Sequence, residues 1–149
     1  MLRRFLVFLL LPGSLFGQTT LRVFVEPFSG REPSGAALRE EFLQQIRKRK
    51  DFIVVAGADQ ADRLVTILGE THVKGYIGRN LRVRYVNSDS QPVYGGYLSI
   101  ELKTRDEQPV WSWLATPRRL GPDDVNRNLA DQAVRKLTEF LSSPAAAKP

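Results

Sequence analysis

The chain has 149 residues, the length of one domain, and its 42% hydrophobic and 26% charged residues exclude disorder for most of it. It has no cysteine, which excludes disulfides, zinc–thiolate and iron–sulfur sites, a cysteine nucleophile and a lipid anchor attached through cysteine. The net charge of +6 includes Arg3 and Arg4 of the leader described next, and the remaining surplus is too modest to select one kind of acidic partner.

Residues 1–17 have the pattern of a secretory signal peptide. Two arginines precede an unbroken apolar run at 5–11, a Pro-Gly pair follows, and Gly17 supplies a small residue before the expected cut. The alternative, an uncleaved anchor, needs about 20 apolar residues, and this run is much shorter. We therefore expect cleavage near residue 17, at a point that the pattern leaves uncertain by a few residues, and a periplasmic or secreted protein.

The first half of the mature chain predicts a strand, a helix and a second strand. Residues 20–26 alternate in polarity and are rich in β-branched side chains, as in a half-buried strand. Ser34 can cap a helix over 35–50, because Leu38, Phe42 and Ile46 form one apolar stripe, with Leu43 beside it. Residues 52–56 are continuously apolar and predict a buried strand.

The middle of the chain predicts mostly strands. We expect a helical turn or loop at 58–62, a long strand at 64–74, a turn at 75–80, a strand at 81–86 and a polar connection at 87–92. The glycine pair at 95–96 is likewise interpreted as a turn, since it does not lie between a strand and a helix as a phosphate-binding loop would.

The last third predicts a hairpin and a helix. Strands are expected at 97–104 and 110–115 around a turn at 106–108, and an amphipathic helix begins after Pro122 and two aspartates. We interpret residues 143–149 as a disordered tail. The element order predicts a single α/β domain (α+β) over 18–142, with one mixed sheet of about five to six strands and two helices packed on one face.

Several short motifs in this order resemble a family of bacterial envelope domains. They are VEPFSG at 25–30, FIVV at 52–55, Ala-Asp at 61–62, LVTILGE at 64–70 and Val-Trp-Ser at 110–112. The family includes the curli-secretion lipoprotein, the lipoprotein activators of penicillin-binding proteins and the amino-terminal domain of the Tol-Pal beta-propeller protein. The resemblance implies a non-enzymatic binding or assembly module. Most lipoprotein members carry an acylated cysteine after the leader, where this chain has Gln18.

A basic, aromatic-interleaved segment is the first candidate partner-binding site. It contains Arg79, Arg82, Arg84 and Tyr85. In a cytosolic protein such a segment is typical of single-stranded nucleic-acid binding, but the leader argues against nucleic acid. Outside the cytoplasm the same segment fits an anionic glycan, a lipid headgroup or an acidic protein. The alternative is an ordinary solvated hairpin face.

Two tryptophans are the second candidate. Trp111 and Trp113 point to the same side of one predicted strand. They form either an aromatic platform for a partner or sugar, or a part of the hydrophobic core.

The sequence contains few residues that are suited to catalysis. His72 is the only histidine, no serine lies in a nucleophile-elbow motif, and no acidic cluster has the spacing of a metal site. We therefore expect no catalytic residue, no metal and no cofactor, and a non-enzymatic exported domain that recognises an envelope protein or an anionic envelope polymer. The alternative is a small hydrolase acting on an envelope polymer, for which Glu70, Glu101 and His72 are the only residues to test.

Overall fold

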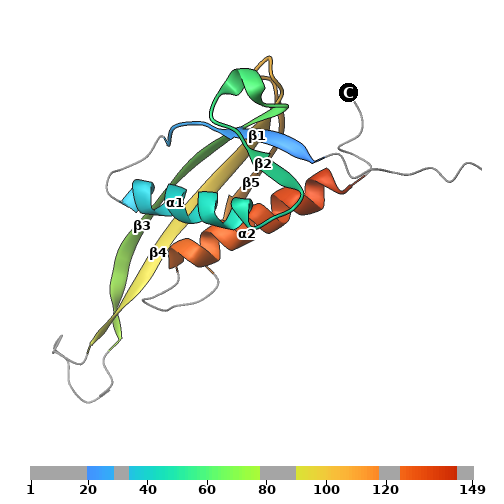
Figure 1. Ribbon diagram of the computed structural model, residues 1–149. Coiled ribbons are helices and arrows are strands. Elements are labelled where there is room, and N and C mark those ends of the chain that lie inside the picture. Colours follow the sequence, from blue (N-terminus) through green and yellow to red (C-terminus); the bar gives the residue numbers. More distant parts are fainter. Residues whose placement is uncertain (1–19, 29–33, 78–89, 118–124, 144–149) are drawn as a thin grey trace, which may run out of the picture.

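The computed structural model describes residues 20–28, 34–77, 90–117 and 125–143, and it contains one mixed five-stranded sheet and two helices (Figure 1). The predicted α+β class is confirmed. The elements are β1 (Leu21–Val25), α1 (Ser34–Arg47), β2 (Phe52–Val54), a 3-10 turn at Ala58–Gln60, β3 (Arg63–Ile77), β4 (Gln91–Lys103), β5 (Pro109–Ala115) and α2 (Val125–Leu141).

The sheet order is β2-β1-β3-β4-β5. β1 lies between β2 and β3 and is parallel to both, whereas β3, β4 and β5 form an antiparallel meander. The segments that connect the strands explain why the sheet has both parallel and antiparallel pairs. The α1 helix links β1 to β2 and allows parallel pairing, while the tight turn between β4 and β5 requires antiparallel pairing.

Both helices cover the same face of the sheet and pack against each other (Figure 1). The stripe predicted for the first helix is buried as expected, since Leu38, Phe42 and Ile46 are fully covered. Leu129 and Leu137 of α2 fill the space beside them. The core is therefore a single layer of side chains between the helices and the sheet.

Strand alternation separates a core face of the sheet from a face without helices, which we call the open face. Val65 and Ile67 of β3 lie opposite Leu102 and Ile100 of β4, and all four are buried under the helices. The residues between them, such as Thr66, have side chains on the open face. No helix in the described part of the chain is long and apolar enough to cross a membrane.

The edge strand β2 differs from the prediction. A buried strand was expected over 52–56, but β2 ends at Val54, and the side chain of Ile53 is 50% exposed. The reason is its position at the edge of the sheet, because β1 is its only neighbour among the described strands and Ile53 faces away from the helices. An apolar run therefore did not distinguish an edge strand from a central one.

The β3 and β4 strands are longer than expected. The predicted turn at 75–80 and connection at 87–92 were wrong in part, because residues 75–77 and 91–92 are paired strand residues. The glycine pair at 95–96 lies inside β4 and is not a turn. The predicted strand at 81–86, the leader at 1–17, the start of the last helix at 122–124 and the end of the tail at 144–149 lie outside the described residues.

Candidate functional site

The far ends of β3 and β4 form a two-stranded extension, which we call the arm: residues 70–77 of β3 and 91–97 of β4. The last β1 partner of β3 is at Val65, and the first β4 residue paired with β5 is Leu98. Beyond these positions the two strands pair only with each other within the described residues. Figure 1 shows the arm extending past the ends of both helices.

A β-bulge determines which side chains the arm presents on each face. Val73 pairs with Tyr94 and Gly75 pairs with Val93, so Lys74 is an additional residue in the ladder. In consequence Tyr76 lies opposite Pro92 instead of Gln91. This shift places Tyr76 on the same side of the arm as Val73 and Tyr94, which is the side that carries the helices farther along the sheet.

The arm exposes large apolar side chains. Val73 is 45% exposed, Tyr76 is 54% exposed and Ile77 is 55% exposed. We call Val73, Tyr76, Pro92 and Tyr94 the apolar row of the arm. A two-stranded ribbon gains little stability from such residues when they face water. Their clustering on a projecting element is typical of a contact surface.

The opposite side of the arm is polar over residues 70–74 of β3. Glu70 lies opposite Tyr97, and His72 lies opposite Gly95. A Cβ atom placed on Gly95 would lie 3.1 Å from His72 Nε2 and 3.6 Å from Lys74 Cβ. His72 and Lys74 therefore lie over the glycine, on the same face as Glu70. Val93 and Ile77 lie farther out on this face, so its ionisable part is confined to residues 70–74.

The residues considered for hydrolysis are not brought together. Glu70 and Glu101 both lie on the open face, but Glu101 is four residues along β4 from Tyr97, the partner of Glu70. At about 3.4 Å per residue the two positions are about 14 Å apart. Paired carboxylates of glycosidases are about 5–9.5 Å apart. Within the described residues, no three His, Asp or Glu side chains form a group suited to a metal ion.

Glu101 instead belongs to an ionic group on the open face of the body. The Glu26 carboxylate accepts a hydrogen bond from the Thr66 hydroxyl and lies 3.4 Å from Lys103 Nζ. Lys103 Nζ also lies 3.8 Å from the Glu101 carboxylate. The group joins the end of β1 to β3 and β4, and Lys103 is shared by the two carboxylates, so its chemistry is that of a structural brace.

A second ionic group ties the start of β3 to its neighbours. The Asp62 carboxylate accepts a hydrogen bond from the Arg22 backbone N–H at 3.0 Å and lies 3.7 Å from the Arg105 guanidinium. The backbone hydrogen bond from Arg22 is the largest cause that lowers the pKa of Asp62, and the two guanidinium groups lower it further. Asp62 therefore stays ionised and links β1 to the β4–β5 turn.

The two tryptophans lie on the helix side of β5. Trp111 stacks on Phe140 of α2, with ring centroids 5.4 Å apart and an angle of 18° between the planes. Trp113 is also partly buried against the core. Both side chains keep some exposure, and their role in partner binding stays a prediction.

The basic segment predicted as a partner site lies outside the described residues. Arg79, Arg82, Arg84 and Tyr85 all fall between Ile77 and Gln91, the paired residues at which the described strands of the arm end. Sequence reasoning did not identify the exposed positions Val73 and Ile77. Because this stretch was interpreted as the end of a strand and a turn, its apolar residues carried no signal of exposure.

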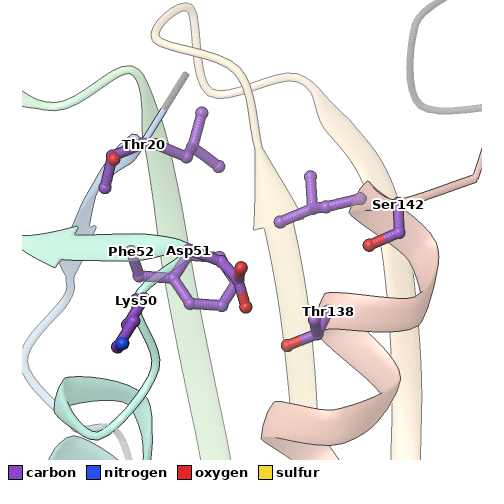
Figure 2. A pocket seen from close by; sticks show the side chains of 8 residues that line it. Thr20, Lys50, Asp51, Phe52, Thr138 and Ser142 are labelled. Atoms are coloured by element: carbon purple, nitrogen blue, oxygen red, sulfur yellow. The ribbon is translucent and has the colours of Figure 1, made fainter. Parts of the chain in front are cut away.

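A pocket of about 340 Å³ opens at the other end of the molecule, between the start of β1 and β2 and the end of α2. Figure 2 shows Thr138 of α2 and Ser142, which follows the helix, across from Asp51 and Phe52, while the Lys50 side chain points away from α2. The Asp51 carboxylate pairs with Arg49 at 3.1 Å, and the Thr138 hydroxyl donates to the Val134 carbonyl. Two of its polar side chains thus have partners outside the pocket, and the lining residues do not form a converging reactive group like that of an active site.

In comparisons with known proteins, this chain is similar to solved structures in its fold. No family model matches the chain, and no curated protein does. The hypothetical protein CT253 from Chlamydia trachomatis is 10% identical with a TM-score of 0.50, over 85% of this chain and 99% of that one. A DUF330 protein from Xanthomonas campestris is 16% identical with a TM-score of 0.48, over 87% and 86% of the two chains.

Bacterial lipoproteins also occur among the similar structures. Uncharacterized lipoprotein B from Nitrosomonas europaea is 16% identical with a TM-score of 0.46, and the match covers 86% of each chain. The specific relationship to the curli-secretion, penicillin-binding-protein activator and Tol-Pal proteins stays a prediction. At these identities the likeness to CT253 shows that the fold has been observed in a bacterial protein, and the function has to be argued from the chain itself.

Proposed function

We propose that this chain is an exported, non-enzymatic binding or assembly-accessory domain of the bacterial cell envelope, which recognises a protein or an anionic envelope polymer through its arm. The observation that carries the proposal is the exposure of Val73, Tyr76 and Ile77 on a projecting pair of strands. The leader expected at 1–17 supports the proposed compartment.

The arm is better suited to recognition than the rest of the described surface. The open face of the body carries paired ionic groups, such as Lys103 between Glu26 and Glu101. Its exposed apolar residues, Ile53, Leu68 and Leu114, lie on three different strands of the body. The apolar row of the arm has no such partners among the described residues. Desolvating it on contact therefore releases free energy without breaking an existing interaction.

The basic residues that follow β3 add a second element to the proposal. Arg79, Arg82 and Arg84 follow the arm directly in the chain, next to Ile77. Three arginines that follow exposed aromatic and apolar residues in the sequence favour a partner that combines negative charge with apolar surface. A hydrolase is disfavoured by the separation of Glu70 and Glu101 along the sheet.

Site-specific photo-crosslinking in intact cells tests the arm. A photo-reactive phenylalanine analogue replaces Tyr76 or, as a matched control, Leu114, which is also 54% exposed but lies on β5. We expect a discrete adduct with one envelope component from position 76 and none from position 114. Adducts from position 114 alone, or from neither position, would remove the arm from the proposal.

Salt-dependent capture tests the arginines. The variant with Arg79, Arg82 and Arg84 changed to Ala should retain less of the crosslinked partner, and the difference from the wild type should shrink at high salt. Arg47, Lys48 and Arg49 at the end of α1 provide a control triple substitution with the same change in charge. Equal losses in both triple variants would mean that only net charge matters.

Two further measurements separate the alternatives. The amino-terminal residue of the purified native protein establishes whether the leader is removed, and an intact Met1 on cytosolic protein would contradict the proposed compartment. Turnover of envelope polymers by the purified domain would favour the hydrolase. In that case the triple change of Glu70, Glu101 and His72 should abolish turnover.

A further inference from the structure

The outer edge of β3 in the arm is an unpaired strand edge. The Val65 carbonyl accepts a hydrogen bond from the Glu26 N–H, so the backbone groups of Val65 point toward the β1 side. Because backbone groups alternate along a strand, those of Gly69, Thr71 and Val73 point the same way. Beyond Val65, β3 has no partner strand on that side among the described residues. The edge is therefore a template for strand addition.

The side chains along this edge are complementary to themselves. On the polar side of the arm the order is Glu70, His72, Lys74, which places a negative and a positive charge at equal distances from the histidine. In an antiparallel pair of identical strands centred on His72, each Glu70 lies opposite Lys74 of the other copy. Opposite charges at directly facing strand positions stabilise a pair, and like charges destabilise it.

The same antiparallel register, centred on His72, also brings the backbone groups of the two strands opposite each other. It places Thr71 opposite Val73 of the other copy, and both residues point their N–H and C=O groups outward. These residues can then exchange backbone hydrogen bonds across the new interface in both directions. The twofold axis is perpendicular to the sheet, so the apolar rows of the two arms lie on one side of a continuous four-stranded ribbon.

We propose that a second copy of this chain occupies the β3 edge, and that two arms pair antiparallel about His72 to form a symmetric homodimer. The contact goes beyond the proposed recognition of an envelope partner and does not depend on it. Each body lies at an opposite end of the ribbon, because the paired strands run in opposite directions. A ribbon contact buries a small area, so the dimer is expected to dissociate on dilution.

Charge reversal tests the proposal on the purified mature protein by sedimentation at low salt over a range of concentrations. Glu70→Lys and Lys74→Glu should each weaken the dimer by about tenfold, because each places like charges opposite each other at two symmetric positions. The double variant E70K/K74E should recover the dimer. An equimolar mixture of the two single variants should form heterodimers, since all the facing charges are then opposite.

Two further variants make the test specific. Glu40→Lys on α1 makes the same chemical change at an exposed position away from the edge and should leave the dimer unchanged. Thr71→Pro removes an outward N–H that β4 does not use and should abolish dimerisation, with retention of the fold checked by tryptophan fluorescence. A monomer at every concentration, or a dimer indifferent to charge reversal, would overturn the proposal.

Discussion

Tyr76 of β3 lies opposite Pro92 of β4, one position away from where an unbroken ladder would place it. The bulge at Lys74 causes this offset, and it gathers the apolar row of the arm on one side. Without the bulge Tyr76 would pair with Gln91 and point to the side that carries His72. One additional residue therefore determines whether the arm has a continuous apolar surface.

Deletion of Lys74 should preserve that surface. The pairs Gly75–Val93 and Tyr76–Pro92 remain possible, because the deleted residue is the one that the ladder leaves unpaired. We expect slower amide hydrogen exchange in the arm, since the regular ladder loses a local disruption. Deletion of Thr71 is the contrasting control, because it moves Val73 to the opposite side. Loss of the Tyr76–Pro92 nuclear Overhauser contact in the Lys74 deletion would contradict the assignment of the bulge.

Gly96 should be the most sensitive position at the base of the arm. Its φ of +154° is rarely adopted by residues with a side chain, and a Cβ there would overlap the Glu70 carbonyl oxygen. We expect Gly96→Ala to lower the free energy of unfolding by about 1–3 kcal/mol in urea denaturation. Gly95→Ala is the matched control and should cost less, because the nearest atom to its Cβ is the movable end of His72 and Lys74 Cβ is at an ordinary contact distance. Equal effects of the two substitutions would argue against backbone strain.

The sequence predicted the elements better than it predicted their lengths. Leu38, Phe42 and Ile46 gave the first helix its correct face, because a helical stripe is a local property. The extent of β3 was missed because Gly75 signals a turn in isolation, whereas in the fold it is paired with Val93. Pairing between distant segments therefore overrode the local signal.

The candidate site was predictable only in outline. A basic segment from Arg79 to Tyr85 was expected to bind a partner, but the exposure of Val73 and Ile77 before it depends on where β1 and β5 stop pairing. That end point depends on tertiary structure and leaves no pattern in the strand itself. The same limit applies to the free edge of β3, which becomes visible only once the sheet order is known.

Stability should depend on pH through Asp62. Its pKa is lowered in the folded protein, first by the Arg22 backbone hydrogen bond, so the ionised form favours folding. This contribution is fully present above the unfolded pKa and is lost as the pH falls through the lowered folded value. We expect Asp62→Asn to flatten the acid side of a plot of melting temperature against pH. Asp106→Asn, an exposed carboxyl in the β4–β5 turn, is the control and should leave the plot unchanged.

The stacked pair Trp111 and Phe140 distinguishes a role in packing from a role in binding. A double-mutant cycle with alanine at both positions should give a coupling energy of about 0.5–1.5 kcal/mol, as expected for stacked rings beyond their buried area. If Trp111 also binds the partner, Trp111→Ala should weaken capture more than Phe140→Ala at a temperature where both variants are folded. Equal capture by the two variants would assign Trp111 to packing alone. A coupling energy near zero would mean that the stacking contributes nothing to stability.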